Sequence, residues 1–303
     1  MRALVTGGAG FIGSNLVDAL LRRGDEVTVL DDLSTGRRAN LDGAIAAGAR
    51  LVEGSVAASA AVEAAFATAR PEVVHHLAAQ IDVHRSVSDP RFDATVNVVG
   101  TATVLEAARR AGARRVVLAS TGGALYGEAD VIPTPESAAI RPLSPYGTAK
   151  AGAELYMELY RRLHGLGTFS LRLANVYGPR QDPRGEAGVI AVFCARALEG
   201  GRATVYGDGR QSRDFVFVGD VVDAFLAAGD ADAEGAANVA TGRETTVLEL
   251  GAALGVELDH GEERAGEVRR SCLDPSTAER VLGWKACVPL ADGLERTLAA
   301  ARG

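Results

Sequence analysis

Tyr146 and Lys150 are the residues whose types and spacing most directly suggest chemistry. They stand four positions apart in a segment, residues 146–164, whose pattern predicts a helix, so both side chains would lie on one face. A lysine ammonium near a phenol favours the phenolate and lowers the tyrosine pKa from its usual value of about 10. We therefore expect a tyrosine that can act as general base or acid near neutral pH.

The same pair also has an ordinary explanation, as an aromatic residue at a helix start and a solvated lysine. Two features of the surrounding sequence favour the chemical interpretation. Ser120 and Thr121 follow an apolar run, residues 115–119, that predicts a strand. A glycine-rich stretch that is typical of nucleotide binding precedes them, near the start of the chain.

That stretch, residues 4–13, combines an apolar strand pattern with a cluster of glycines and runs into a helical pattern over residues 14–23. Gly8-x-Gly10-x-x-Gly13 has the dinucleotide-binding spacing, and Gly7-x-x-Gly10-x-x-Gly13 has a related one. The helix start would offer free N–H groups to a pyrophosphate. Asp31 follows a second predicted strand and lies 18 positions after Gly13, near the ~20 expected for an acid that binds the ribose.

The elements that must position these residues alternate between strands and helices. Apolar strand patterns occur at residues 50–53, 72–77, 115–119 and 168–173, and helical patterns at 57–69, 89–111 and 146–164. Wholly apolar strands that alternate with helices indicate a parallel sheet covered on both faces. We predict an α/β, Rossmann-type doubly wound parallel sheet over residues 1–175, and a smaller C-terminal substrate-binding lobe over 176–303 that is interleaved with the end of the sheet.

Composition narrows the class of ligand. The chain has 303 residues, of which 47% are hydrophobic and 23% charged, and a net charge of −7, so we expect no nucleic acid partner. No apolar run approaches the ~20 residues of a membrane span, and Met1 directly precedes the first strand, so we expect neither a membrane segment nor a signal peptide. The three cysteines lack metal-ligand spacing and suggest a reducing, cytoplasmic compartment, and we interpret His75 and His76 as packing residues rather than metal ligands.

At this point the chain resembles the extended short-chain dehydrogenase/reductase family of NAD-dependent epimerases and dehydratases. The matching segments run in the family's order over nearly the whole chain. They are Thr6–Gly13, His76–Ala79, Asn97, Tyr126–Gly127, Tyr146 with Lys150, Asn175–Pro179, Gly207–Gly209, Arg213–Val216 and Arg264–Glu267. Within the family the chain is most similar to the UDP-glucose 4-epimerases, in the bacterial and archaeal subgroup with Ser-Thr-Gly-Gly before Tyr-Gly.

The resemblance implies a tightly held NAD, a UDP-sugar substrate and inversion at sugar carbon 4 through a 4-keto intermediate. Tyr146 would take the proton of the 4-hydroxyl, and Lys150 would hold the nicotinamide ribose. Asp31 and Asp32 would bind the adenosine ribose. The implied cofactor-binding residues are Gly7, Gly10, Phe11, Ile12, Gly13, Asp31, Asp32, Leu77, Ala78, Ala79, Gln80, Asn97, Tyr146 and Lys150.

The implied substrate-binding residues lie mostly in the second half of the chain. Asn175 would contact the diphosphate, Arg213 and Arg264 would clamp it, and Tyr206 would lie near the uracil. Taken singly, each arginine would be better explained by a surface ion pair. The full set is Thr121, Tyr146, Asn175, Val189, Tyr206, Arg213, Arg264, Glu267 and Ser271.

The chain departs from the family pattern at Gly122, where a serine or threonine usually contacts the substrate. Thr121 is the first candidate to replace that hydroxyl, and Ser120 is the second. A dehydratase or decarboxylase would carry an acid just after the active-site hydroxyl, and Gly122 and Gly123 offer none. A non-catalytic NAD-sensing protein would not need the intact Tyr146 and Lys150.

The identity of the sugar stays open on sequence grounds, and glucose/galactose, N-acetylated hexoses and uronic acids all fit. A small residue at Ser271 would leave room for an N-acetyl group, unless a shift of register makes Ser271 pack against Cys272 instead. The resemblance also implies a homodimer formed through residues 89–111 and 146–164.

Overall fold

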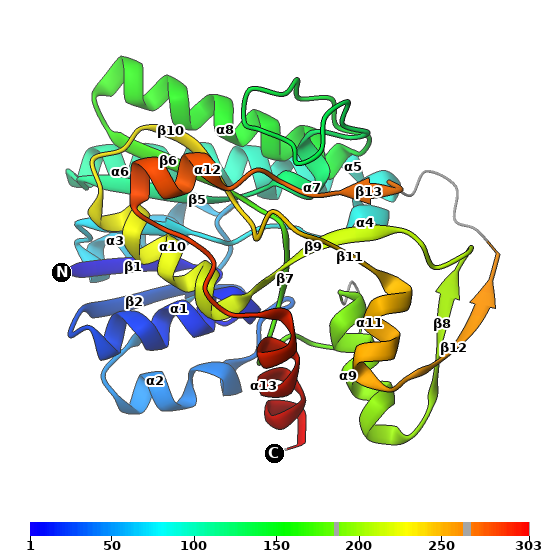
Figure 1. Cartoon of the computed structure of the whole chain (residues 1–303). Coiled ribbons are helices and arrows are strands. Elements are labelled where there is room, and N and C mark those ends of the chain that lie inside the picture. The colour runs from blue at the N-terminus through cyan, green and yellow to red at the C-terminus, as the bar shows by residue number, and fades with distance from the viewer. Residues whose placement is uncertain (185–187, 263–267, 303) are drawn as a thin grey trace.

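The chain is described by a computed structural model that covers residues 1–184, 188–262 and 268–302. Its main feature is a seven-stranded sheet, all parallel, in the order β10-β6-β5-β4-β1-β2-β3 (Figure 1). The strands are β1 (Arg2–Thr6), β2 (Glu26–Asp31), β3 (Arg50–Glu53), β4 (Val73–His76), β5 (Arg115–Thr121), β6 (Gly167–Leu173) and β10 (Gly235–Val239). The strand order reverses between β1 and β4, which is where ligands bind in doubly wound sheets.

Helices cover both faces of this sheet. The helical elements of this part of the chain are α1 (Phe11–Arg22), η1 (Arg38–Leu41), α2 (Asp42–Ala46), α3 (Ser59–Ala69), α4 (Val83–Ser88), α5 (Pro90–Ala94), the π-helical turn η2 (Thr95–Val99), α6 (Gly100–Ala111), α7 (Gly122–Leu125), α8 (Pro145–His164), α10 (Val218–Asp230) and α12 (Ser276–Leu282). The helices α1 and α10 pack on one face, and α3, α6 and α8 pack on the other.

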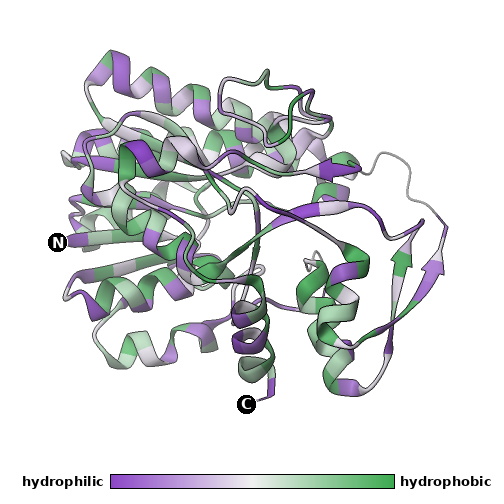
Figure 2. Ribbon diagram, in the orientation of Figure 1, coloured by the Kyte–Doolittle hydropathy of each residue, from purple (hydrophilic) through white to green (hydrophobic). Residues whose placement is uncertain are grey.

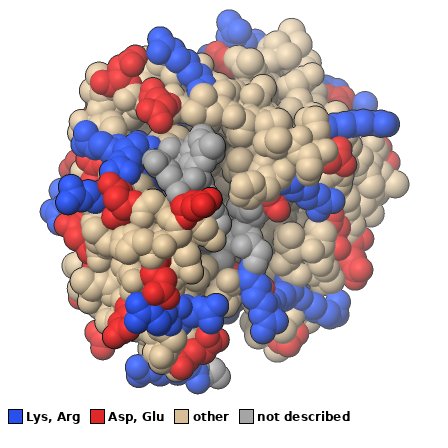
Figure 3. Space-filling model, turned by 90° about the vertical axis from the view of Figure 1, so that its right-hand side faces the viewer, with Lys and Arg blue, Asp and Glu red and all other residues tan. Residues whose placement is uncertain are grey.

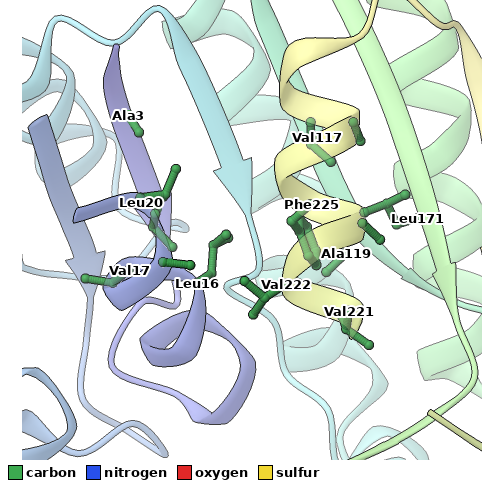
Figure 4. Close-up of a cluster of buried hydrophobic side chains, with 14 of the residues drawn as sticks. Ala3, Leu16, Val17, Leu20, Val117, Ala119, Leu171, Val221, Val222 and Phe225 are labelled. Carbon is green, nitrogen blue, oxygen red and sulfur yellow. The ribbon is translucent and has the colours of Figure 1, made fainter. Parts of the chain in front are cut away.

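The alternation of strand side chains divides the core into two layers. In β5, Val117 and Ala119 face α1 and α10, whereas Val116 and Leu118 face α3, α6 and α8. Figure 4 shows the first layer, where Phe225 of α10 lies close to Ala119 and Leu171. Apolar residues therefore dominate the strands of the large sheet (Figure 2), as expected for parallel strands that are covered on both sides.

The remaining elements form a second group beside the carboxyl ends of the large sheet (Figure 1). They are β7 (Asn175–Tyr177), α9 (Val189–Glu199), β8 (Arg202–Tyr206), β9 (Ser212–Phe217), β11 (Glu244–Thr246), α11 (Val247–Leu254), β12 (Glu257–Gly261), β13 (Arg270–Ser271) and α13 (Leu290–Arg302). Strand β9 pairs with β7, β11 and β13, and β8 pairs with β12. A separate core, with Phe193, Phe215 and Leu250, holds this group together.

The predicted Rossmann-type fold is confirmed. The structure refines the prediction for residues 89–111, which form α5, η2 and α6 in succession rather than one regular helix. It also adds α4 and the short strand β7, which were not predicted. Strand β10 and helix α10 lie beyond residue 175 and still belong to the large sheet and its cover, so the division of the chain into two domains stays a prediction.

Candidate active site

The turn between β1 and α1 depends on its glycines. Gly7 has φ +71°, and a Cβ there would lie 2.6 Å from the backbone nitrogen of Ala78. A Cβ on Gly13 would lie 2.1 Å from the carbonyl oxygen of Gly7. The N-cap residue of α1 is Gly10, so no side chain covers the free N–H groups at the helix start. This close-packed turn gives the backbone cradle that a pyrophosphate needs.

A cavity of about 620 Å³ opens at the carboxyl ends of β1, β2, β4 and β5 and reaches the start of α8. Thirteen of the cofactor-binding residues implied by the resemblance line it, and they are Gly7, Gly10, Phe11, Ile12, Gly13, Asp31, Asp32, Leu77, Ala78, Ala79, Gln80, Tyr146 and Lys150. The glycine turn and the Tyr146–Lys150 pair therefore line the same cavity. This donor set and the glycine cradle fit a dinucleotide.

Asn97 is the exception, because it does not line the cavity. It is buried on η2, and its side-chain amide bonds the backbone N–H and C=O of Gln80 at 2.9 Å each. The contact of Asn97 with the cofactor therefore stays a prediction. Its position on a π-helical turn makes it a support for the cavity wall at Gln80.

The two acids after β2 differ in their surroundings. Asp31 is buried, and its carboxylate accepts hydrogen bonds from the backbone N–H groups of Ala9 and Leu33, at 2.8 Å each. Burial raises the pKa of Asp31, and these two backbone bonds oppose the rise. Asp32 is exposed and accepts bonds from the backbone and hydroxyl of Ser34. Asp31 consequently also fixes the glycine turn, whereas Asp32 lies at the open edge of the cavity.

Helix α8 carries the candidate acid–base pair. Ser144 caps its start by accepting a bond from the N–H of Gly147, and Tyr146 and Lys150 follow one turn apart. The Lys150 ammonium is buried and donates to the carbonyl oxygen of Ala119 at 2.9 Å. The helix geometry therefore places both groups over the end of β5, as the sequence pattern predicts.

The predicted pKa of Tyr146 is wrong in direction. Burial raises the pKa of Tyr146 to about 12, the negative charge of Asp93 raises it further, and a hydrogen bond with Thr121 opposes the rise. Burial likewise lowers the pKa of Lys150 to about 8. Desolvation is the largest cause of both shifts, because both groups lie in a poorly solvated part of the cavity.

The hydroxyl groups at the end of β5 have different partners. Thr121 makes a hydrogen bond with the Tyr146 phenol. The hydroxyl of Ser120, in contrast, donates to the Glu154 carboxylate at 2.5 Å, and Glu154 forms a buried ion pair with Arg172 at 2.7 Å. Thr121 is therefore the hydroxyl that the geometry offers to a reaction at Tyr146.

Several residues proposed for the second lobe lie next to one another across β9. Arg213 pairs in register with Thr245 of β11 and Ser271 of β13, while Asn175 of β7 pairs with Phe215. Val189 is the first residue of α9. Tyr206 is the last residue of β8, and its side chain is exposed. None of these side chains lines the 620 Å³ cavity. Arg264 and Glu267 lie outside the described residues.

Asp214 holds this part of the lobe together. It is buried beside Arg213, and its carboxylate accepts bonds from the backbone N–H groups of Thr241 and Gly242, at 2.9 Å each, and from the Thr241 hydroxyl at 2.6 Å. The Cys272 thiol lies 3.6 Å from the same carboxylate. One buried acid thus fixes β9 against the segment that carries Ser271.

Sequence reasoning missed the arginines at the mouth of the cavity. Arg37, Arg85 and Arg180 line it, and Arg37 forms an ion pair with Asp182 that joins the loop after β2 to the loop after β7. On the face shown in Figure 3, the described basic and acidic side chains are intermingled. No sequence signal marks Arg37 and Arg180, because their two loops meet only in the folded chain. Arg85 lies on α4, which was not predicted.

The two adjacent histidines are buried in the core, as predicted. His76 bonds the hydroxyls of Thr6 at 2.7 Å and Thr101 at 3.0 Å, whereas neither ring nitrogen of His75 has a partner. Burial lowers the pKa of each to about 3, so both are neutral near pH 7. In the described part of the chain, no group of histidine, cysteine and acidic residues is placed to hold a metal ion. No helix there is long and apolar enough to span a membrane.

A glycine cradle at the switch point of a doubly wound sheet, facing a Tyr-x-x-x-Lys pair, defines the short-chain dehydrogenase/reductase class of dinucleotide-dependent enzymes. The chain belongs to the NAD dependent epimerase/dehydratase family, whose model matches residues 3–240. It is 48% identical to the UDP-glucose 4-epimerase of Mycolicibacterium smegmatis, over 98% of this chain and 97% of the relative.

Two UDP-glucose 4-epimerases are among the solved structures that resemble the whole chain. The UDP-glucose 4-epimerase of Thermotoga maritima with UDP-glucose is 44% identical, covers 100% of this chain and 99% of its own, and superimposes with a TM-score of 0.95. The UDP-glucose 4-epimerase of Thermus thermophilus in complex with NAD is 43% identical with the same coverage and a TM-score of 0.92.

Proposed function

We propose that this chain is an NAD-dependent epimerase that inverts carbon 4 of a UDP-hexose, with UDP-glucose and UDP-galactose as the pair. The observation that carries the proposal is the single cavity that joins the glycine turn to Tyr146 and Lys150. The three relatives described above are named UDP-glucose 4-epimerases, and the structures of two of them are complexes with UDP-glucose and with NAD.

The cofactor-binding residues divide by chemistry. The turn from Gly7 to Gly13 would offer backbone N–H groups to the pyrophosphate, Asp31 and Asp32 would bind the adenosine ribose, and Lys150 would hold the nicotinamide ribose. A bound NAD would supply a reversible hydride acceptor for sugar carbon 4 and a positive charge that favours the phenolate of Tyr146. Because the cofactor ends as it began, the enzyme has no need to exchange it.

Tyr146 takes the proton of the sugar 4-hydroxyl and later returns it to the 4-keto sugar. Burial holds the phenol protonated in the protein alone, so Tyr146 becomes a base only where positive charge approaches it. Thr121 bonds the phenol and is the hydroxyl that orients the 4-oxygen. The Ser120 hydroxyl already donates a hydrogen bond to Glu154, so Ser120 is the weaker candidate for contact with the substrate.

The second lobe would hold the UDP part of the substrate. Asn175 and the guanidinium groups of Arg213 and Arg264 would bind the diphosphate, because an arginine fork suits phosphate geometry. Tyr206 would contact the uracil. The positions of Arg213 and Ser271 in neighbouring strands support a sugar pocket beside the diphosphate. Val189 and Glu267 complete the proposed substrate contacts.

Other members of the family perform other reactions on nucleotide sugars. Inversion of UDP-N-acetylglucosamine or UDP-glucuronic acid needs the same acid–base pair and stays a candidate. A dehydratase or decarboxylase needs an acid after the active-site hydroxyl, and Gly122 and Gly123 stand there. A protein that only senses NAD would have no use for a tyrosine paired with Thr121 in the cavity.

We also propose a homodimer in the cytoplasm. Leu155, Leu159 and Leu163 are spaced four residues apart on α8 and are 72%, 43% and 65% exposed, and Val99 of η2 is exposed as well. An apolar stripe of this kind suits burial against a second copy. The three cysteines are all free thiols, which agrees with a reducing compartment.

The experiment that tests the proposed cofactor is its release from purified protein. After denaturation, the supernatant should contain close to one NAD per chain by enzymatic assay. Recovery of NADPH, or turnover that consumes NADPH in proportion to product, would show that the reaction is a net reduction and would overturn the proposal.

A further inference from the structure

Asp93 is a buried acid for which the proposed reaction gives no role. It lies on α5 and is 0% exposed. One carboxylate oxygen, Oδ1, accepts bonds from the Gln80 side chain at 2.9 Å and the Asn97 side chain at 3.0 Å. The other oxygen, Oδ2, is buried and has no partner. An unpartnered buried carboxylate oxygen is costly and calls for an explanation.

Helix α5 packs against α8, the helix that carries Tyr146 and Lys150. The charge of Asp93 acts on both of these groups: after burial itself, it is the next cause that raises the pKa of Tyr146, and it favours the charged form of Lys150. Burial raises the pKa of Asp93 itself, while the bond from Gln80 and the charge of Lys150 oppose the rise. The three groups therefore form one electrostatic unit.

Few other charges reach this unit. On α8, Glu154 faces Lys150 from the next turn but is tied to Arg172 of β6. His76 of β4 is neutral. The other titratable or charged groups on the elements packed around α8 are on α4, α5, α6 and β5, and they are His84, Arg85, Arg91, Glu106, Arg109, Arg110 and Arg115. Arg85 lies over the Phe92 ring, 4.0 Å from its centroid.

We propose that Asp93 is a positioning residue for the acid–base pair: its buried carboxylate supplies the negative charge that sets the basicity of Tyr146 and balances the charge of Lys150. This inference rests on the proposed role of Tyr146. The hydrogen bonds of Oδ1 fix the carboxylate against Gln80 and Asn97, and the unpartnered Oδ2 leaves its charge unscreened. A phenolate that is too stable would be too weak a base to take the proton of the 4-hydroxyl, so the negative charge of Asp93 supports the first half of the reaction.

The test compares neutral and charged replacements. In Asp93→Asn and Asp93→Ser the charge is gone, whereas Asp93→Glu retains it. Asp89→Asn is the matched control, because it removes one negative charge from the exposed N-cap of the same helix, where asparagine caps as well as aspartate. The readout is the pH at which the Tyr146 phenolate appears in each purified protein with its cofactor, by NMR of tyrosine labelled with carbon-13 at Cζ. Tyr146→Phe identifies the resonance.

We expect the phenolate of Tyr146 to appear at a pH about one unit lower in both neutral variants. The acid limb of kcat/KM should move by the same amount, whereas Asp93→Glu and Asp89→Asn should titrate as the wild type does. The titration needs no turnover, so it stays informative if the proposed reaction is wrong. An unchanged titration in the neutral variants, or an equal shift in Asp93→Glu, overturns the proposal. Failure of both neutral variants to fold overturns it too, since the carboxylate would then serve the fold.

Discussion

A Cβ atom on Gly122 would lie 2.2 Å from Cδ1 of Leu273, far inside van der Waals contact. Leu273 is buried against Leu125 and Tyr126, and its backbone bridges to Thr134. The side chain of Leu273 therefore fills the space that a side chain at position 122 would need. This contact explains why the chain has glycine at position 122.

Restoring a hydroxyl with Gly122→Ser should consequently destabilise the fold rather than improve the site. Overpacking a filled site costs ~1–3 kcal/mol, and the loss should appear as a lower midpoint of denaturant unfolding. Leu273→Ala by itself should lower the free energy of unfolding by ~2–5 kcal/mol. When Gly122→Ser is added to that variant, the further loss of stability should be small, because the side chain that clashes with the serine is absent.

Gly123→Ser is the matched control for that experiment. A Cβ at Gly123 has only the Thr121 hydroxyl oxygen near it, at 4.0 Å, so the serine should leave stability nearly unchanged. Equal losses for the two serine variants, or an undiminished loss without the Leu273 side chain, would show that Leu273 does not fill the position.

Substitutions of Tyr146 on α8 and of the hydroxyl residues at the end of β5 should lower kcat by different amounts. Tyr146→Phe should lower kcat by ~10²–10⁴-fold, because it removes the acid–base group, and NAD should still be bound. Thr121→Ala should cost less, and Thr121→Ser should recover most of the loss. Ser120→Ala should cost less than Thr121→Ala, since Ser120 bonds Glu154. A Ser120→Ala enzyme slower than Thr121→Ala would reverse the assignment.

The buried histidines should make the fold sensitive to acid. His75 has a pKa of about 3 in the fold against an ordinary value of 6.5, so below pH 6.5 the unfolded chain takes up a proton that the folded chain does not. The free energy of unfolding then falls as pH decreases, by about 1.4 kcal/mol per pH unit for each histidine, down to the folded pKa. Above pH 6.5 this effect is absent.

His75→Phe should remove one of these two contributions. The difference in free energy of unfolding between variant and wild type is measured by denaturant unfolding at pH 5 and pH 8. It should favour the variant by about 2 kcal/mol more at pH 5 than at pH 8. The exposed His84 provides the matched control, His84→Gln, which removes an imidazole from the surface rather than from the core. A His75→Phe variant that follows the wild-type pH dependence would mean that His75 is protonated in the fold.

Ser271 tests the choice of sugar. Its place beside Arg213 across β13 and β9 suits a residue at the edge of a sugar pocket, and a small side chain leaves room for an N-acetyl group. We expect wild type to accept UDP-N-acetylglucosamine beside UDP-glucose, and Ser271→Tyr to lower the turnover of the N-acetylated sugar selectively. An unchanged ratio in the variant, or complete rejection by wild type, would show that Ser271 is not a gate.

Most of the fold could be predicted because its signals are local. The apolar runs that became β1 to β6, and the glycines that end β1, carry their information within a few neighbouring residues. The family and the NAD-dependent epimerase interpretation are confirmed, since Tyr146, Lys150 and the glycine turn keep a spacing that depends on the same local elements.

The rest depends on contacts between distant segments. Leu273 reaches Gly122 from the far end of the chain, and Asp93 reaches Tyr146 from a helix that the sequence pattern merges with its neighbours. The direction of the Tyr146 pKa was wrong for the same reason: desolvation is set by everything that packs around a group, and spacing along a helix does not reveal it.

The central claim is tested most directly by incubating the purified protein with UDP-glucose and no added cofactor, and following the proton on sugar carbon 4 by NMR. The account predicts that UDP-galactose appears until both sugars are at equilibrium, with no net oxidation or reduction, and that the Tyr146→Phe variant leaves UDP-glucose unchanged. An absence of interconversion in the NAD-loaded wild type, or a product that forms only with stoichiometric NADPH, would contradict it.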